Sequence, residues 1–123
     1  MKIKTAELTG AALDWAVAEC EGYDCLFDDE VSGAWLVPQQ GYLHDEKPLS
    51  KFNPTANWAQ GGPIIERERI ELRFDRSGRM TNPWNASTLE RMTGGPTPLM
   101  AAMRCYVASK LGDEIKVPEE LLK

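Results

Sequence analysis

The chain has 123 residues, a net charge of −5 and 42% hydrophobic residues, which suits one domain with one modest core. We therefore expect a single compact domain over residues 1–123, and the composition excludes a chain that is disordered throughout. No apolar run approaches the ~20 residues of a membrane span, so we expect a cytoplasmic protein that is not bound to a membrane. The negative charge argues against direct binding to a nucleic-acid backbone.

Charge is distributed unevenly along the chain. Residues 1–60 carry ten acids, four Lys and no Arg, whereas all seven Arg lie between Arg67 and Arg104. Arginine presents a planar fork of donors that suits phosphate or carboxylate. The pattern is typical of a salt-bridged surface, and it is also compatible with a local patch that binds anions.

The first half of the chain predicts one helix, one strand and a long loop. Apolar residues spaced as on one helical face predict a helix over 9–22, with Thr9 as its N-cap and Gly22 as its stop. Residues 34–38 are typical of a short strand. A polar segment near 39–57 predicts a long loop, which in a compact domain is either functional or disordered.

The second half predicts a hairpin, a long helix and an edge strand. One short helical turn is expected from Pro63, followed by antiparallel strands at 70–74 and near 84–87. A helix is predicted from Pro98 to about Leu111, capped by Thr97, and an edge strand at 114–118. The expected fold is α+β: a small, mainly antiparallel sheet packed against two principal helices.

Residues that carry enzyme chemistry are sparse. The three cysteines predict free thiols in a reducing compartment, and His44 is predicted to be exposed, so no metal site and no cofactor are expected. Glu66 and Glu68 are the only carboxylates that suggest acid–base work, and their alternation with arginines favours a self-neutralising surface. We therefore predict no catalytic residue and no enzyme activity.

Two Gly-Gly-Pro segments are better candidates for binding. Gly61 and Gly62 stand before Pro63, and Gly94 and Gly95 stand before Pro96, each ahead of a predicted helix. A helix N-terminus attracts anions, and glycine lets a ligand approach the backbone closely. Ordinary helix punctuation uses the same residues, so both interpretations stay open.

Aromatic residues extend the candidate site. Trp58 precedes the first glycine pair in a stretch without periodicity, and an indole face can stack on a nucleobase at roughly 1–3 kcal/mol. Core packing is the alternative for any Trp. The candidate ligand-binding residues are Trp58, Gly61, Gly62, Pro63, Gly94, Gly95, Thr97 and Arg104.

Three segments carry a family resemblance: "KIKTAELTGAALDWAVAECEGYD", "NPTANWAQGGPIIERERIEL" and "GPTPLMAAMRCYVASKLGDEIKVPEEL". They resemble the NinX family of small proteins from lambdoid phages and related prophages, and the resemblance is weaker over 24–50 and 75–92. It implies an accessory phage protein in the bacterial cytoplasm. The family has been described as one of unknown function, so the resemblance assigns no catalytic residue.

Three functions remain open at this point. The first is a sponge that sequesters a phosphorylated nucleotide-like molecule, such as a host immune signal, without cleaving it. Such pockets often form between protomers, so this function also predicts a homo-oligomer. The second is a protein–protein inhibitor or adaptor that docks through an acidic face, and the third is an enzyme of nucleotide metabolism.

Overall fold

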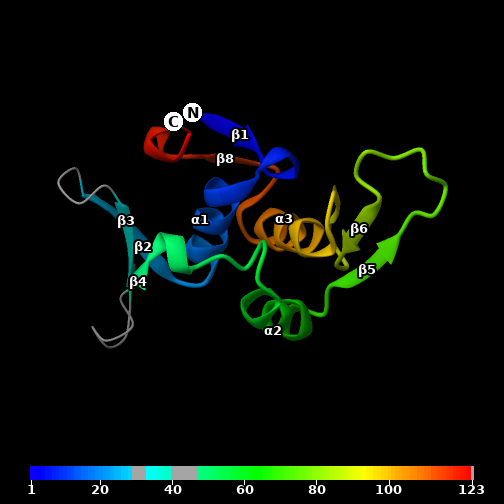
Figure 1. Cartoon of the computed structure of the whole chain (residues 1–123), viewed down its shortest axis with the longest axis horizontal. Helices are drawn as coiled ribbons and strands as arrows, with labels where there is room; N and C mark the ends of the chain where they lie inside the picture. Colours follow the sequence, from blue (N-terminus) through cyan, green and yellow to red (C-terminus); the bar gives the residue numbers. More distant parts are fainter. Residues whose placement is uncertain (29–32, 40–46, 123) are drawn as a thin grey trace.

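The computed structural model describes residues 1–28, 33–39 and 47–122. It confirms the predicted α+β class, with three α-helices and three small antiparallel sheets in the described part (Figure 1). The helices are α1 (Gly10–Cys20), α2 (Trp58–Glu68) and α3 (Pro98–Leu111). Figure 1 shows α1 and α3 at the centre, with one sheet on either side and the paired chain ends above them. The expected single sheet is thus divided into three.

Helix α3 is the centre of the core and follows its predicted bounds. The Thr97 hydroxyl accepts a hydrogen bond from the Met100 N–H, and Gly112, with φ +93°, follows the last turn. The helix is buried at Leu99 and from Ala101 to Ala108, on more than the one face that its apolar spacing predicted. It is enclosed because α1, α2 and the strands of one sheet each contact it.

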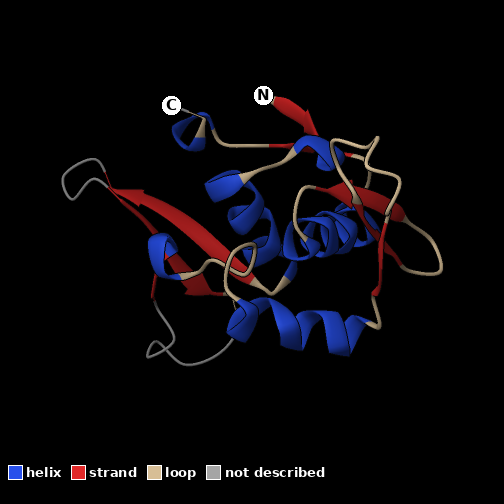
Figure 2. Cartoon of the chain, turned by 45° about the vertical axis from the view of Figure 1, so that its right-hand side comes forward, coloured by secondary structure: helices blue, strands red, loops and turns tan. Residues whose placement is uncertain are grey.

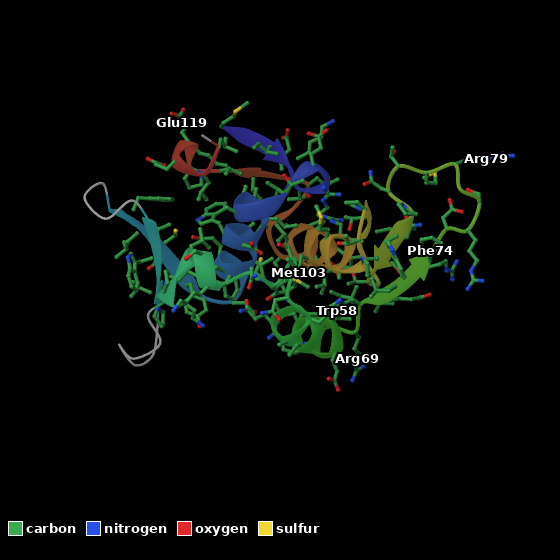
Figure 3. The ribbon with its side chains drawn as sticks, in the orientation of Figure 1. Trp58, Arg69, Phe74, Arg79, Met103 and Glu119 are labelled. Atoms are coloured by element: carbon green, nitrogen blue, oxygen red, sulfur yellow. The ribbon has the colours of Figure 1, made fainter. Side chains whose placement is uncertain are left out.

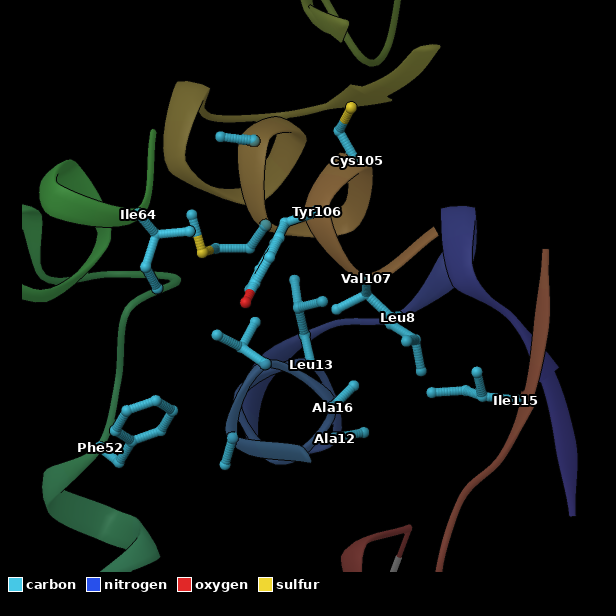
Figure 4. Packing of buried hydrophobic residues seen from close by; sticks show 14 of the residues in the cluster. Leu8, Ala12, Leu13, Ala16, Phe52, Ile64, Cys105, Tyr106, Val107 and Ile115 are labelled. Atoms are coloured by element: carbon cyan, nitrogen blue, oxygen red, sulfur yellow. The ribbon is translucent and has the colours of Figure 1, made fainter. Parts of the chain in front are cut away.

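The opposite sides of α3 meet different neighbours. Figure 4 shows Tyr106 pointing toward Leu13 of α1, while Cys105 points the other way. On that other side the Cys105 Sγ lies 3.7 Å from the Arg91 carbonyl, and the Thr93 hydroxyl donates to the Ala101 carbonyl. Small side chains on this side let the strand after Arg91 approach the helix closely.

Helix α1 keeps its predicted position and leads into the first three-stranded sheet. The order is β2 (Tyr23–Asp28), β3 (Gly33–Pro38), β4 (Lys47–Pro48), and we call it sheet B. Figure 2 shows β2 and β3 leaving the helical body as a long ribbon. The predicted strand at 34–38 is confirmed as part of β3, whereas β2 was not predicted.

The predicted loop near 39–57 is partly ordered. Strand β4 is followed by a 3-10 turn, η3 (Leu49–Lys51), whose Leu49 is buried. Phe52 follows this turn, and its ring lies 6.0 Å from the Tyr23 ring, centroid to centroid. Residues 40–46 lie outside the described residues.

The second three-stranded sheet, sheet C, contains the predicted hairpin. Its order is β5 (Glu71–Phe74), β6 (Trp84–Ser87), β7 (Met92–Gly95). Phe74 pairs with Trp84 across the hairpin, and their ring centroids are 5.0 Å apart. Strand β7 was not predicted, because its Met-Thr-Gly-Gly sequence has little strand propensity of its own.

The prediction of one helical turn from Pro63 is wrong. Helix α2 begins at Trp58, where the Asn57 side chain accepts the Ala59 N–H. Gly61, Gly62 and Pro63 therefore lie inside the helix and do not form its entrance. Two glycines and a proline are poor helix formers, so this helix depends on its cap and on its packing against α3.

The chain ends pair with each other. Strand β1 (Lys2–Lys4) is antiparallel to β8 (Glu114–Lys116), with Ile3 opposite Ile115, which confirms the predicted edge strand. No helix in the described ranges is long and apolar enough to cross a membrane.

Candidate functional site

The two glycines of the first pair have different surroundings: Gly61 is closely packed and Gly62 is open. A Cβ on Gly61 would lie 2.5 Å from the Pro54 carbonyl oxygen and 2.6 Å from the Leu99 Cδ2. Gly61 therefore serves the close contact between α2 and the first turn of α3. At Gly62 a Cβ would meet nothing within 4 Å.

The second glycine pair is a close contact within the protein. Gly95 ends β7, and a Cβ there would lie 2.6 Å from the Ala101 N and 2.9 Å from its Cα. A Cβ on Gly94 would lie 3.4 Å from the Asn82 Cβ. The space that the sequence suggested for a ligand at Gly95 is filled by α3 itself.

Arg104 is buried and bound to the backbone. Its Nε donates to the Leu8 carbonyl and its Nη1 to the Gly94 carbonyl, both at 2.9 Å. Burial lowers the pKa of the Arg104 guanidinium. These bonds join α3 to the segment before α1 and to β7, so Arg104 has a structural role in this arrangement.

Trp58 is the most accessible of the predicted ligand residues. This residue, labelled in Figure 3, is 54% exposed at the start of α2. Gly62 lies one turn further along the same helix. The structure thus brings Gly61 to Leu99, two residues after the Thr97 cap, and it leaves Trp58 and Gly62 at the surface. It does not assemble the eight predicted residues around one cavity in the described part of the chain.

A charged network that the sequence did not reveal joins the three helices. Arg67 Nη1 and Nη2 donate to the two oxygens of Glu21 at 3.1 and 2.7 Å, and the Tyr106 hydroxyl donates to the same carboxylate at 2.7 Å. Burial and then Glu21 raise the pKa of Tyr106. The "ERER" alternation showed that charges would pair, but not that Glu21 would be the partner.

Glu68 completes this network. It accepts from Arg67 Nε at 2.9 Å and forms an ion pair with the Lys110 ammonium at 3.2 Å. Its neighbour two positions earlier, Glu66, is exposed and lies at a different angle around α2. An acid–base pair requires two carboxylates that face each other, and Glu66 and Glu68 do not.

A second polar tie holds the segment before α2 against α1. Asp14 is buried, and one of its carboxylate oxygens accepts from the Thr55 hydroxyl at 2.7 Å and from the Thr55 N–H at 3.2 Å. Burial raises the pKa of Asp14, and the bonds from Thr55 oppose that rise. This tie fixes the chain where it approaches α2.

The thiols and carboxylates of the described residues form no metal-binding group. Burial, with a smaller contribution from the Glu21 charge, raises the pKa of Cys20 to about 12, and burial and then Glu19 raise that of Cys25 to about 11. Cys105 is buried, and all three cysteines are free thiols, as predicted. His44 lies outside the described residues.

Sheet B presents an apolar face that the sequence analysis did not single out. Leu26 of β2 pairs with Trp35 of β3, so both side chains project from the same side of the sheet. They are 58% and 39% exposed. Val37 and Pro48 share this side by register and are half-buried, and we call these four residues the outer face of sheet B.

The other side of sheet B faces the core. Leu36 is fully buried there, and Cys25, directly opposite on β2, packs against the core cluster. In β3 the buried Leu36 thus follows the exposed Trp35 on the opposite side of the sheet, and a large apolar residue occupies the exposed position. Polar residues normally fill such positions on a half-exposed antiparallel sheet.

The fold and these contacts define a small α+β protein whose polar clusters join helices to one another. The family model described as "Bacteriophage P22, NinX" matches residues 4–110. The chain belongs to this NinX family of phage proteins. No curated protein of similar sequence was found.

Proposed function

We propose that this protein acts by binding a partner protein, as an inhibitor or adaptor, and that the outer face of sheet B is the surface that binds. The observation that carries the proposal is the cross-strand pair of Leu26 and Trp35, two large apolar side chains side by side at the surface. Exposed apolar residues that gather on one face, rimmed by polar ones, are typical of interaction sites. Aromatic residues are also enriched at the centres of protein interfaces.

The surroundings of this face supply its polar rim. Asp24 lies on the same side of β2 by register and accepts a hydrogen bond from the Gln39 side chain at 2.9 Å. The acidic first half of the chain, which suggested an acidic docking face, includes this sheet. An apolar centre with acidic neighbours favours a partner surface that is apolar and basic.

The experiment is affinity capture from phage-infected bacteria with three forms of the tagged protein. The wild type is compared with a Leu26→Lys, Trp35→Ser double variant and with Leu89→Lys. Leu89 is fully exposed in the turn between β6 and β7, so its variant adds the same charge on a different sheet. We expect a protein retained by the wild type and by Leu89→Lys to be lost with the double variant. Equal capture by all three forms contradicts the proposal.

A second candidate function, the sequestration of a nucleotide-like molecule, is favoured by Trp58. Its indole is exposed and offers a face on which a planar ring can stack, and the backbone at Gly62, one helical turn further on, is open. In a phage protein such binding without cleavage would remove a host immune signal, which is an anti-defence role. The buried positions of Gly95 and Arg104 limit this candidate to the α2 side of the predicted site.

A thermal-shift screen against nucleotides and cyclic nucleotide signals tests this second function. A ligand that stabilises the wild type and Trp35→Ala, but not Trp58→Ala, supports it, because both variants lose an exposed indole. Native mass spectrometry of the same samples reports whether the bound molecule is intact and whether the protein is a homo-oligomer. A cleaved product instead favours an enzyme.

A further inference from the structure

We propose that the free edge of β2 accepts an extended segment of the partner protein as an added strand, and that this segment carries Lys or Arg between apolar residues. The inference rests on the docking function proposed above, and it specifies the mode of binding and the chemistry of the partner. It follows from the backbone groups at the edge of sheet B and from the charges beside them.

Among the described residues, strand β2 lies at one edge of sheet B, and its register shows which of its backbone groups are not directed to β3. The Gln39 N–H donates to the Gly22 carbonyl at 2.9 Å, which marks that pair as a hydrogen-bonded one. Because hydrogen-bonded and non-hydrogen-bonded pairs alternate, Asp24 and Leu26 also point their backbone groups to β3. Tyr23, Cys25 and Phe27 must then point their N–H and C=O groups away from β3, toward the open edge.

The same alternation explains the prolines of this sheet. Pro38 is opposite Tyr23 and Pro48 is opposite Trp35, both at non-hydrogen-bonded positions, where the missing N–H costs no bond between those strands. Strand β2 itself contains no proline or lysine, two residues that natural sheets place on exposed edges to prevent pairing with another chain, and its charged residues are Asp24 and Asp28.

Apolar side chains border the open edge on both sides of the sheet. Leu26 lies on the outer face, and Phe27, which is 37% exposed, points to the opposite side. An added strand would place its alternate side chains beside these two residues. Such a strand gains backbone hydrogen bonds from the edge and selectivity from the side chains next to it.

Charge beside the edge identifies the kind of segment that fits. Glu19 lies in the last turn of α1 and Asp24 in β2, and burial, followed by the charge of Asp24, raises the pKa of Glu19. Neither forms an ion pair with the described residues. Residues 19–28, from the end of α1 through β2, contain four acids and no Lys or Arg, and Glu21 among them is paired with Arg67. Lys47 lies nearby, with its ammonium over the Tyr23 ring at 4.9 Å.

These charges disfavour a second copy of the chain as the occupant. A two-fold pair of β2 strands in the register that sets Asp24 opposite its own copy would face like charges, which destabilise a strand pair. A segment with Lys or Arg neutralises the same carboxylates instead. We therefore commit to a basic, apolar segment of a different protein.

The test uses a short, blocked peptide in which lysine and valine alternate, and a matched peptide of glutamate and valine. Fluorescence anisotropy with the full-length protein is expected to show binding of the lysine peptide at least about ten-fold tighter than the glutamate peptide. Hydrogen exchange measured by NMR is expected to slow at the N–H groups of Cys25 and Phe27 when the lysine peptide binds. Equal binding of both peptides, or unchanged exchange at these two amides, overturns the proposal.

Two further peptides separate strand pairing from simple charge attraction. One carries N-methyl groups on its valine amides and the other on its lysine amides. Because an added strand bonds through every second residue, we expect one pattern to lose binding by about ten-fold and the other to keep it. If both methylated peptides bind as well as the parent, the backbone is not paired and the inference is wrong.

A variant of the protein provides the matching change. Cys25→Pro removes an N–H that faces the open edge and no bond to β3, and Cys25→Ser is its control. We expect the proline variant to lose peptide binding while the serine variant keeps it, with thermal melts showing that both are folded. If Cys25→Pro unfolds, the methylated peptides and the exchange at Phe27 decide the question with the wild-type protein.

The docking function and the strand pairing can fail separately. One outcome is that the captured partner is lost with the Leu26→Lys, Trp35→Ser double variant while both N-methylated peptides bind as tightly as the parent peptide. That result supports docking on the outer face of sheet B and overturns strand pairing at the edge. Self-association of the wild type, with slowed exchange at Cys25 and Phe27, shows that a second copy occupies the edge and overturns the choice of partner.

Discussion

Arg67 and Glu21 lie 46 positions apart in the sequence and form a bidentate ion pair, with the closer contact at 2.7 Å. The pair joins α2 to the end of α1, and the Tyr106 hydroxyl of α3 donates to the same carboxylate. One guanidinium thus orients all three helices. Because Arg67 is half exposed, solvent screens much of its charge. Its contribution to stability therefore depends more on the geometry of its hydrogen bonds than on its charge alone.

Replacing Arg67 with Ala is expected to lower the free energy of unfolding by about 1 kcal/mol, since charge-assisted hydrogen bonds to Glu21 and Glu68 are lost. Urea denaturation followed by circular dichroism measures the change. Arg73→Ala is the control, because Arg73 pairs with Glu71 on the exposed side of β5 with both side chains largely in solvent. An equal effect of the two changes contradicts a special role for Arg67.

Acid is expected to destabilise the protein partly through Glu68. Hydrogen bonds from Arg67 lower the pKa of Glu68, with Lys110 adding to the effect. A carboxyl group with a lowered pKa in the folded state stabilises the fold above its unfolded pKa of about 4.3, and this stability is lost as the pH falls through the folded value. Glu68→Gln should therefore flatten the fall of the melting temperature below about pH 4.3. The control is Glu66→Gln, which removes an exposed carboxylate of the same helix that forms no ion pair with the described residues.

Two glycine substitutions should have opposite effects. Gly95→Ala places a methyl group 2.6 Å from the Ala101 N, which is backbone, and should cost about 1–3 kcal/mol by overpacking. Gly62→Ala meets nothing within 4 Å inside α2 and should stabilise the protein by up to about 1 kcal/mol through helix propensity. Thermal melts of both variants provide the comparison. A Gly95→Ala protein as stable as the wild type would show that the contact with α3 is loose.

The thiols should react slowly in the native protein. With the pKa of Cys20 raised to about 12 and that of Cys25 to about 11, little thiolate is present near neutral pH, and Cys105 is buried. A disulfide reagent such as Ellman's reagent, at about pH 8, should modify the native protein slowly and all three cysteines at once in denaturant. Fast modification of the native protein at this pH contradicts the raised pKa of the Cys20 and Cys25 thiols.

The sequence was most informative where local signals and packing agree. Helix α3 has its predicted bounds because Thr97 caps it and Gly112 follows its last turn. The β5–β6 hairpin was predictable because its residues alternate and a turn with Gly78, at φ +74°, lies between them. The family resemblance could also be identified from the sequence and is confirmed by the family model.

Sequence reasoning failed where a distant contact overrides local preference. The Gly-Gly-Pro segment of α2 is helical because Asn57 caps the chain before it and Leu99 packs on Gly61. Strands β1 and β7 depend on partners that their own short sequences do not reveal. For the candidate site, the burial of Arg104 against Leu8 decides its role, and nothing local to Arg104 indicates that contact.

The position of α3 near the end of the chain affects the order in which the protein can be made and folded. During synthesis, at about 5–20 residues per second, α1 and sheet B leave the ribosome before the helix on which most of the core packs. Strand β1 emerges first and must wait for β8, which follows α3. Apolar residues such as Leu13 and Val17 stay uncovered until then, so nascent chains that stop before residue 98 should bind chaperones rather than fold.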